Sequence, residues 1–459
     1  MKKLICILFF LFPVAALAQQ PGYKQSPLDY AWKYVGNEGF LSGEIGFINL
    51  AFSQSGRPYV AFMDGTKSKK LSVKMYFITN WAYVGNGGIS TGAVDEISLV
   101  VSPSDNQPYV AYMANGEGGK VVKFNGNTWV KVGQDLGQTG CVSLAFSPSG
   151  ELYVAYAYYV TDVSGKATVM KFNGTAWVNV GTAEFSAGKV HYISLAFSPS
   201  GQPYVAYVDE GNASKATVMK FDGTSWINVG NPGFSGSAVQ YTSLALSPSG
   251  EPYVAFQDWA NSQKATVMIF NGATWVNAGN AGFSPGEADY TSLAFSPSNG
   301  QPYVAFKDFG NSNKATVMKY NGTNWVNVGN QGFSPGEVFF TSLAFSPADH
   351  QPYVAYDDAV SVFSGAVMRY DSVMAGINKS GVSKFLLYPD PATDKLTIET
   401  SEDYAPGRLS VMNMNGEQVL TGSLIRPKTQ IDVGNLPAGV YFVRLINNRT
   451  VEAGKFVKH

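Results

Sequence analysis

Charged residues are scarce in this chain, and neither sign dominates. Asp, Glu, Lys and Arg make up 14% of the 459 residues, with 32 basic against 33 acidic side chains. A protein that binds nucleic acid or anionic lipid through charge needs a basic surface, which this composition does not supply. Aromatic residues also reach 14%, and glycines number 49. The chain can therefore bury a large core and turn often, which excludes disorder and coiled coil.

Cysteine is almost absent, with Cys6 and Cys141 as its two copies. Cys6 lies in a segment typical of a secretory signal peptide: a basic start, an apolar run up to Leu17, and small residues before Gln19. The apolar run is shorter than a membrane anchor and lacks a positive stop-transfer flank. We predict that residues 1–18 are a cleaved signal peptide and that the mature protein has no transmembrane segment.

Cleavage leaves Cys141 as the sole cysteine, which excludes an intramolecular disulfide and a cysteine-built zinc or redox site. Because an apolar strand pattern follows it, we expect Cys141 to be a buried small hydrophobe rather than a reactive thiol.

Internal repetition dominates the rest of the chain. Four short motifs recur in a fixed order, seven times each: Ser-Leu-Ala-Phe-Ser, Pro-Tyr-Val-Ala, Ala-Thr-Val-Met-Lys-Phe and Trp-x-x-x-Gly, with near matches. The fourth motif begins at Trp32, Trp81, Trp129, Trp177, Trp226, Trp275 and Trp325. Its copies lie about 49 residues apart, within the range of propeller and solenoid repeats.

Each motif is short, rich in Val, Tyr, Phe, Thr and Trp, and bounded by turn formers such as Ser200-Gly201 and Asn173-Gly174. These features are typical of β-strands, and none of the segments is long enough for a helix. The inner runs are apolar at nearly consecutive positions, so both faces of each sheet are buried between neighbouring sheets. We therefore predict blades arranged around an axis.

The phase of the repeats predicts how the ring closes. The fourth motif appears at Trp32, before the first copy of the other three, and is missing after the last third motif ends at Tyr370. An N-terminal strand that completes the last blade hides two edges that would otherwise be exposed. We predict an all-β protein, with a seven-bladed β-propeller over residues 28–372 whose last blade is closed by the N-terminal strand.

The pattern changes after the propeller. Residues 373–384 are rich in Gly, Ser and Lys and have no repeat character, which predicts a linker. Residues 385–459 contain short alternating segments between Gly and Asn turns, which predicts a small C-terminal β-sandwich. Its motifs are an opening Tyr388-Pro389-Asp390-Pro391, a central Gly439-Val-Tyr441-Phe-Val and a terminal Lys455-Phe-Val-Lys458.

These motifs resemble the type A C-terminal sorting domain of proteins exported by the type IX secretion system of Bacteroidota, with Asp390 where the family has Asn. The propeller in front of it resembles those of secreted proteins from the same phylum. The resemblance implies export across the inner membrane by the signal peptide and across the outer membrane by recognition of this domain. The type IX machinery would then be a partner, and the protein would be secreted or held on the outer cell surface.

We expect the binding face to be the one with the long loops. In an up-and-down blade the loops after the second and fourth strands emerge on the same face, and here both are long, whereas the opposite turns are short. Binding residues favour such loops on a rigid scaffold. On this face Asp and Lys recur six residues apart, as Asp209 and Lys215, Asp258 and Lys264, and Asp308 and Lys314.

Two interpretations of these Asp/Lys pairs stay open. They could bind a polar ligand such as a sugar. Alternatively, the Asp could cap backbone amides in a turn while the Lys compensates its negative charge. The Asp-x-x-Asn spacing, as in Asp209 and Asn212, also suits a calcium ion held by oxygen ligands. Because a denser acidic loop is missing, we expect no cofactor, with calcium as the alternative.

Trp259 is the one tryptophan outside the fourth motif. It lies at a loop tip, with Phe309 at the equivalent place in the next blade and Glu210 in the previous one. An exposed aromatic ring can stack on a sugar, so Trp259 and Phe309 are candidate ligand-binding residues. Packing against a neighbouring loop is the alternative. Glu287 and Glu337 recur in identical Ser-Pro-Gly-Glu turns, which favours a structural role over a catalytic pair.

The sequence contains no recognisable catalytic constellation. We place His191 and His350 in loops about three blades apart, without a nucleophile motif nearby, and His459 ends the chain. We predict a non-catalytic adhesin or lectin-like protein that binds a glycan or a cell-surface protein, since near-identical blades favour repeated binding sites. A polysaccharide hydrolase or lyase with its site in the channel is one alternative, which carboxylates clustered on one or two blades would favour. A structural or protein-docking module is the other.

Overall fold

The computed structural model describes residues 29–37, 39–40, 43–77, 80–158, 165–358, 364–373, 385–400, 407–413, 417–426, 428–446 and 451–459. The predicted signal peptide and most of the predicted linker lie outside the described residues. Tyr30–Asp371 form one compact unit, and the strands that follow Ser372 belong to another. Almost all regular structure is β-strand, which confirms the predicted fold class.

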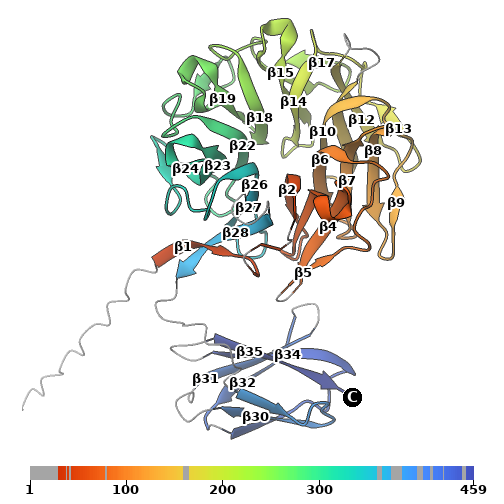
Figure 1. Ribbon diagram of the computed structural model, residues 1–459, viewed down its shortest axis with the longest axis vertical. Helices are drawn as coiled ribbons and strands as arrows, with labels where there is room; N and C mark the ends of the chain where they lie inside the picture. The colour runs from red at the N-terminus through yellow and green to blue at the C-terminus, as the bar shows by residue number, and fades with distance from the viewer. Residues whose placement is uncertain are drawn as a thin grey trace, which may run out of the picture. The chain divides into compact units, whose positions relative to one another are not determined.

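Seven four-stranded antiparallel sheets are arranged around a common centre in the first unit (Figure 1). Blade one has β2 (Ile45–Phe52), β3 (Pro58–Asp64), β4 (Lys70–Phe77) and β5 (Asn80–Tyr83). Blade two has β6 (Val94–Val101), β7 (Pro108–Ala114), β8 (Gly118–Phe124) and β9 (Trp129–Lys131). Blade three has β10 (Thr139–Phe146), β11 (Leu152–Tyr158), β12 (Lys166–Phe172) and β13 (Trp177–Asn179).

The next three blades repeat this arrangement. Blade four has β14 (Val190–Phe197), β15 (Pro203–Asp209), β16 (Lys215–Phe221) and β17 (Trp226–Asn228). Blade five has β18 (Val239–Leu246), β19 (Pro252–Asp258), β20 (Lys264–Phe270) and β21 (Trp275–Asn277). Blade six has β22 (Ala288–Phe295), β23 (Pro302–Asp308), β24 (Lys314–Tyr320) and β25 (Trp325–Asn327).

Blade seven takes its outer strand from the other end of the propeller. It has β26 (Val338–Phe345), β27 (Pro352–Asp358), β28 (Ser364–Val373) and β1 (Asp29–Tyr34), paired in the order β1-β28-β27-β26. This strand order confirms the predicted closure of a seven-bladed ring by the N-terminal strand.

Burial falls from the middle of each blade to its rim. Every residue of β3 and β15 is buried, because each blade is packed between two others. In the outer strand β21, by contrast, Trp275 is buried while the next two residues are exposed. Outer strands this short leave little free edge for another chain to pair with.

Two rings of hydrogen bonds join neighbouring blades. In the inner ring, a Leu amide of one blade donates to the motif-one Ser, or to Asn49, of the blade before it, at all seven junctions. In the outer ring, each motif-four Trp donates its indole N–H to a carbonyl of the preceding blade. Both rings close between blades seven and one, from Leu50 N to Ser342 Oγ at 3.0 Å and from Trp81 Nε1 to Val35 O at 2.7 Å.

The second compact unit is a sandwich of two sheets. The three-stranded sheet has β29 (Phe385–Tyr388), β30 (Lys395–Thr400) and β33 (Lys428–Asp432). The four-stranded sheet runs in the order β32 (Gln418–Leu424), β31 (Gly407–Met412), β34 (Gly439–Ile446) and β35 (Val451–Lys458). Apolar residues of both sheets, such as Ile398 and Val443, form one buried core, as expected for the predicted β-sandwich.

We expect the loss of the closing tryptophan to destabilise the propeller. Trp32 is 8% exposed, donates to Val328 O at 2.7 Å and stacks on Phe333 with ring centroids 4.2 Å apart. Trp32→Ala should lower the free energy of unfolding by about 3–5 kcal/mol, measured by urea denaturation followed by tryptophan fluorescence. The matched control Trp259→Ala removes an exposed tryptophan and should stay within about 0.5 kcal/mol of the parent. Equal losses in the two variants would contradict the closure.

Candidate functional site

The Asp residues singled out in the sequence begin tight turns on the long-loop face. Asp209, Asp258 and Asp308 each cap a one-turn 3₁₀ helix: η2 (Glu210–Asn212), η3 (Trp259–Asn261) and η4 (Phe309–Asn311). Asp258 accepts hydrogen bonds from the Ala260 amide at 3.0 Å and from Asn261 Nδ2 and Thr266 Oγ1, both at 2.8 Å. The other two turns repeat this pattern. Asp64 likewise caps η1 (Gly65–Lys67) in blade one.

These carboxylates are used inside their own turns and are not available to a ligand, because Asp209, Asp258 and Asp308 are all buried. The Asn of each turn donates to the Asp instead of joining it as a second oxygen ligand. Among the described residues, no group of three His, Cys, Asp or Glu side chains could hold a metal ion. The geometry therefore fits the structural-turn interpretation.

The Lys partners do not answer the Asp charges. Lys215, Lys264 and Lys314 lie directly across the strands from the capping Asp residues. Within the part of the chain that the structure describes, however, no ion pair joins them. Since each Asp already accepts three hydrogen bonds, a salt bridge is not needed to satisfy it. The expected charge pairing in these turns is thus wrong.

Trp259 and Phe309 occupy equivalent, exposed positions in adjacent blades. Each is the first residue of its 3₁₀ turn, with 51% of Trp259 and 39% of Phe309 accessible to solvent. Their backbone amides donate to Ala238 O at 3.3 Å and to Glu287 O at 3.1 Å, which anchors each turn to the loop that enters the same blade. Both loop types therefore meet on one face, and the two rings stand on hydrogen-bonded supports.

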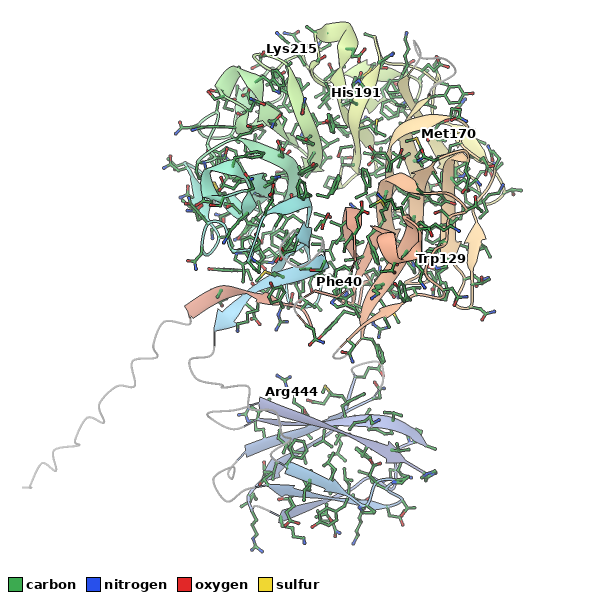
Figure 2. All side chains as sticks on the ribbon, in the orientation of Figure 1. Phe40, Trp129, Met170, His191, Lys215 and Arg444 are labelled. Atoms are coloured by element: carbon green, nitrogen blue, oxygen red, sulfur yellow. The ribbon has the colours of Figure 1, made fainter. Side chains whose placement is uncertain are left out.

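The equivalent position in blade four holds Glu210, which contacts His191. The two side chains lie 2.7 Å apart, from Nε2 to Oε1, and both are exposed. His191 belongs to the inner strand β14 and Lys215 to the third strand β16 of the same blade (Figure 2). The placement of His191 in a loop was wrong, because the residues before the recognised motif already pair with β15.

A cavity of about 440 Å³ lies at the centre of the ring, where the enzyme alternative would place its site, but its lining residues were not predicted from the sequence. Equivalent positions of the seven inner strands hold Phe47, Glu96, Cys141, Tyr192, Tyr241, Tyr290 and Phe340. All of these except Cys141 line the cavity. The sequence signal for this lining was the Tyr that recurs two residues before the Ser of the first motif. Only the shape of the folded strand, however, turns this position toward the axis.

Five of these residues form a continuous aromatic crescent (Phe47, Phe340, Tyr290, Tyr241 and Tyr192). Neighbouring ring centroids are 4.6–4.9 Å apart. Each lies at a β-bulge with φ between 50° and 54°, a conformation that bulky residues rarely adopt. Such conformations cost about 1–3 kcal/mol each and cluster at functional sites.

Glu96 and Cys141 fill the rest of this ring of positions. Within the described residues the Glu96 carboxyl has no hydrogen bond or ion pair. Burial, aided by the charge of Asp95, raises its pKa to about 8. Burial and the nearby Glu96 also raise the pKa of the half-buried Cys141 thiol to about 12, so this thiol is unreactive at neutral pH.

Glu287 and Glu337 connect neighbouring blades. Glu337 Oε1 is 2.8 Å from Nζ of Lys307, which is 4% exposed. Glu287 Oε1 lies 3.4 Å from Gln257 Nε2, which also donates to Asp289 Oδ1 at 2.5 Å. Each Glu thus reaches the second strand of the preceding blade, which fits the structural role expected for it.

The sorting motifs, far apart in the sequence, meet in the second unit. The Val457 amide donates to Asp390 Oδ1 at 2.7 Å, and Ala392, which follows Pro391, pairs with Lys458. The segment from Gly439 to Phe442 pairs with Lys458 to Lys455 along β34 and β35. The remaining motif residues lie beside these: Tyr388 ends β29, Pro389 follows it, and Tyr441 donates to Pro437 O at 2.8 Å.

Comparison with known proteins identifies this unit. Residues 386–459 match the family of secretion system C-terminal sorting domains, which confirms the resemblance. The chain is also 32% identical over 88 residues to karilysin of Tannerella forsythia, covering 17% of this chain and 19% of that protein. A protein with this tail is sent to the cell surface or the extracellular space. None of the described helices has the length and hydropathy to span a bilayer.

Three solved structures are similar to parts of this chain. The extracellular domain of a putative hybrid two-component system from B. thetaiotaomicron has a TM-score of 0.50 at 12% identity, covering 94% of this chain and 59% of that one. PorZ, a surface component of the type IX secretion system of Porphyromonas gingivalis, has a TM-score of 0.45 at 13% identity, covering 90% and 59%. An α-L-arabinofuranosidase of Fusarium graminearum has a TM-score of 0.42 at 13% identity, covering 61% and 93%.

We expect the capping Asp residues to contribute to stability. Asp258→Ala leaves three hydrogen-bond donors in a buried turn without an acceptor, which should lower the free energy of unfolding by about 1–3 kcal/mol. Urea denaturation measures the loss. Lys264→Ala, across the same turn, is the control and should change stability by less than about 0.5 kcal/mol. A fully stable Asp258→Ala variant would show that the turn does not need its cap.

We also expect Glu96 to make stability depend on pH. Folding raises the pKa of Glu96 from 4.5 to about 8, so between these values the folded protein holds a proton that the unfolded chain has lost. The free energy of unfolding is therefore highest at low pH and falls as the pH rises through this window. Glu96→Gln should therefore melt at a higher temperature than the parent at pH 8.5, and the difference should shrink toward pH 5. Hydrogen bonds from Ser247 and Ser249 lower the pKa of Glu251, so Glu251→Gln should show no such gain. Identical pH profiles for the parent and Glu96→Gln would contradict the assignment.

Proposed function

We propose that this is a non-catalytic binding protein of the cell surface or its surroundings, whose propeller recognises glycans through aromatic side chains on the long-loop face. The type IX secretion machinery is the partner that the sorting domain would engage during export. The proposal is carried by one observation: the exposed Trp259 and Phe309 at equivalent turns of adjacent blades.

The chemistry of these turns suits a sugar ring. An aromatic face stacks on the apolar side of a sugar without burying many polar groups. Asn261, the polar side chain of η3, already donates to Asp258, whereas the Trp259 ring is exposed to solvent. Two such rings on neighbouring blades would let a polymeric glycan contact the protein twice, which strengthens binding without new contacts at either site.

The hydrolase alternative rests on Glu96. A carboxyl with a pKa of about 8 in a central cavity is suited to donate a proton to a leaving group. Glycosidases, however, use a pair of carboxyl groups, and Glu96 is the single carboxyl among the described lining residues. The other carboxyls with raised pKa values on the inner two strands are spread over blades two, six and seven (Asp95, Asp289 and Asp357), not clustered on one or two blades. We therefore favour binding.

A glycan array probed with the full chain tests the proposal. We expect the parent to bind one glycan class and Trp259→Ala or Phe309→Ala to weaken that binding at least tenfold, because aromatic anchors carry much of the energy of such contacts. The matched control is Ile227→Ala, since Ile227 is about as exposed as Phe309 but lies on the outer strand β17. Absence of glycan binding, or equal binding by all variants, would overturn the proposal. Hydrolysis of an array glycan by the parent and not by Glu96→Gln would favour the enzyme.

A further inference from the structure

A second cavity lies where the ring closes, between blades one and seven. Its volume is about 350 Å³. Its aromatic lining comes from Phe47, Phe339 and Phe340, and the rings of Phe47 and Phe340 lie 4.6 Å apart. Asp357, near the end of β27, also lines it. The cavity thus combines apolar walls with one deeply placed carboxyl group.

The carboxyl group of Asp357 lacks a partner. The residue is 3% exposed, and its buried Oδ1 accepts no hydrogen bond from the described residues. At the same strand position, blades five and six hold Gln257 and Lys307, whose polar ends are paired with carboxylates. A buried acceptor without a donor destabilises a protein, so it calls for an explanation such as a ligand.

The charges around Asp357 leave it without compensation. Burial, the charge of Asp358 and the charge of Glu44 raise the pKa of Asp357 to about 7. Lys69, the cation among the lining residues, already pairs with Glu44 at 2.8 Å. A cation bound in the cavity would therefore stabilise the ionised form of the Asp357 carboxyl group.

The aromatic walls favour the same kind of ligand. An aromatic face attracts an ammonium group that lies within about 6 Å of the ring centre. One ammonium group already lies over the Phe339 ring, because Lys307 Nζ is 3.9 Å from its centroid. A metal ion would need several oxygen ligands, and the described residues include no cluster that could supply them.

We propose that this cavity binds a primary ammonium group, with Asp357 as its counter-ion and Phe47, Phe339 and Phe340 as its walls. The ammonium group pairs with the carboxylate of Asp357, and the alkyl part contacts the rings. A lysine side chain and an amino sugar both present this chemistry. The site is separate from Trp259 and Phe309 and does not depend on the glycan proposal.

Ligand titration of the full chain by NMR tests the site. The probe is n-butylammonium at pH 8, with 1-butanol as the uncharged control. We expect n-butylammonium to bind and Asp357→Asn to weaken that binding at least tenfold, while 1-butanol binds more weakly and equally to both. Asp358→Asn is the comparison variant, because it removes a neighbouring charge but keeps the carboxyl group that lines the cavity. Loss of the Asp358 charge lowers the pKa of Asp357, so this variant should still bind at pH 8 and should lose far less affinity than Asp357→Asn. Equal loss in both variants, or no loss in Asp357→Asn, would overturn the proposal.

The pH dependence gives a second readout. A proton competes with the ammonium group for Asp357, so the affinity should fall about tenfold between pH 8 and pH 6. An affinity independent of pH would overturn the role of Asp357. If Asp357→Asn does not fold, Phe339→Leu keeps the carboxyl group and should still weaken binding several-fold by removing one aromatic face.

Two further probes separate the ligand sources. Glucosamine represents the amino sugar. Lysine amide acetylated on its α-nitrogen, which keeps the side-chain ammonium group free, represents the protein side chain. Whichever binds more tightly than n-butylammonium identifies the source. Binding of neither one nor n-butylammonium overturns the site. A glycan array that fails for Trp259→Ala has no bearing on this result, because the two sites share no residue.

Discussion

The indole hydrogen bond between neighbouring blades is the interaction on which the propeller depends. Each motif-four Trp donates to a carbonyl of the blade before it, so every blade is tied to its neighbour by the same kind of bond. The seventh bond is possible only because β1 joins blade seven and brings Trp32 to Val328 O. The closed ring leaves only short, protected strand edges, and it brings equivalent residues of the inner strands together around one centre.

Because the scaffold is repeated, the candidate sites lie where the repeats differ. The aromatic crescent occupies five of the seven inner positions, and Glu96 and Cys141 interrupt it. The second-strand position is apolar in the early blades but holds Lys307 and Asp357 in the last two. The two rings of hydrogen bonds that join the blades do not involve these side chains, so the side chains can change without opening the ring. At the second-strand position, Gln257 and Lys307 add contacts to the next blade through Glu287 and Glu337. The propeller thus separates the residues that hold it together from those that can bind.

Most of the fold could be predicted from the sequence. Strand periodicity and the offset of Trp32 from the other motifs were enough for the blades and their closure, since a strand and its partner must bury matching apolar faces. The site could be predicted only in part. Trp259 and Phe309 were found because they depart from the repeat, whereas His191 was placed in a loop instead of a strand and the aromatic crescent was missed. Those residues lie at β-bulges, where the rule of alternating sides no longer tells which way a side chain points.

Local chemistry carried by the sequence itself was sufficient to define the strands and the sorting motifs of the last unit, because each motif consists of residues close together in the chain. For the turns at Asp258 and its equivalents, the hydrogen bonds of the folded turn were needed to favour capping over ligand binding. Only the folded ring decided that Glu96 stands among tyrosines and that Asp357 is buried beside three phenylalanine rings without a donor. These neighbours come from other blades, and the pKa of a carboxyl group is set by what surrounds it in space.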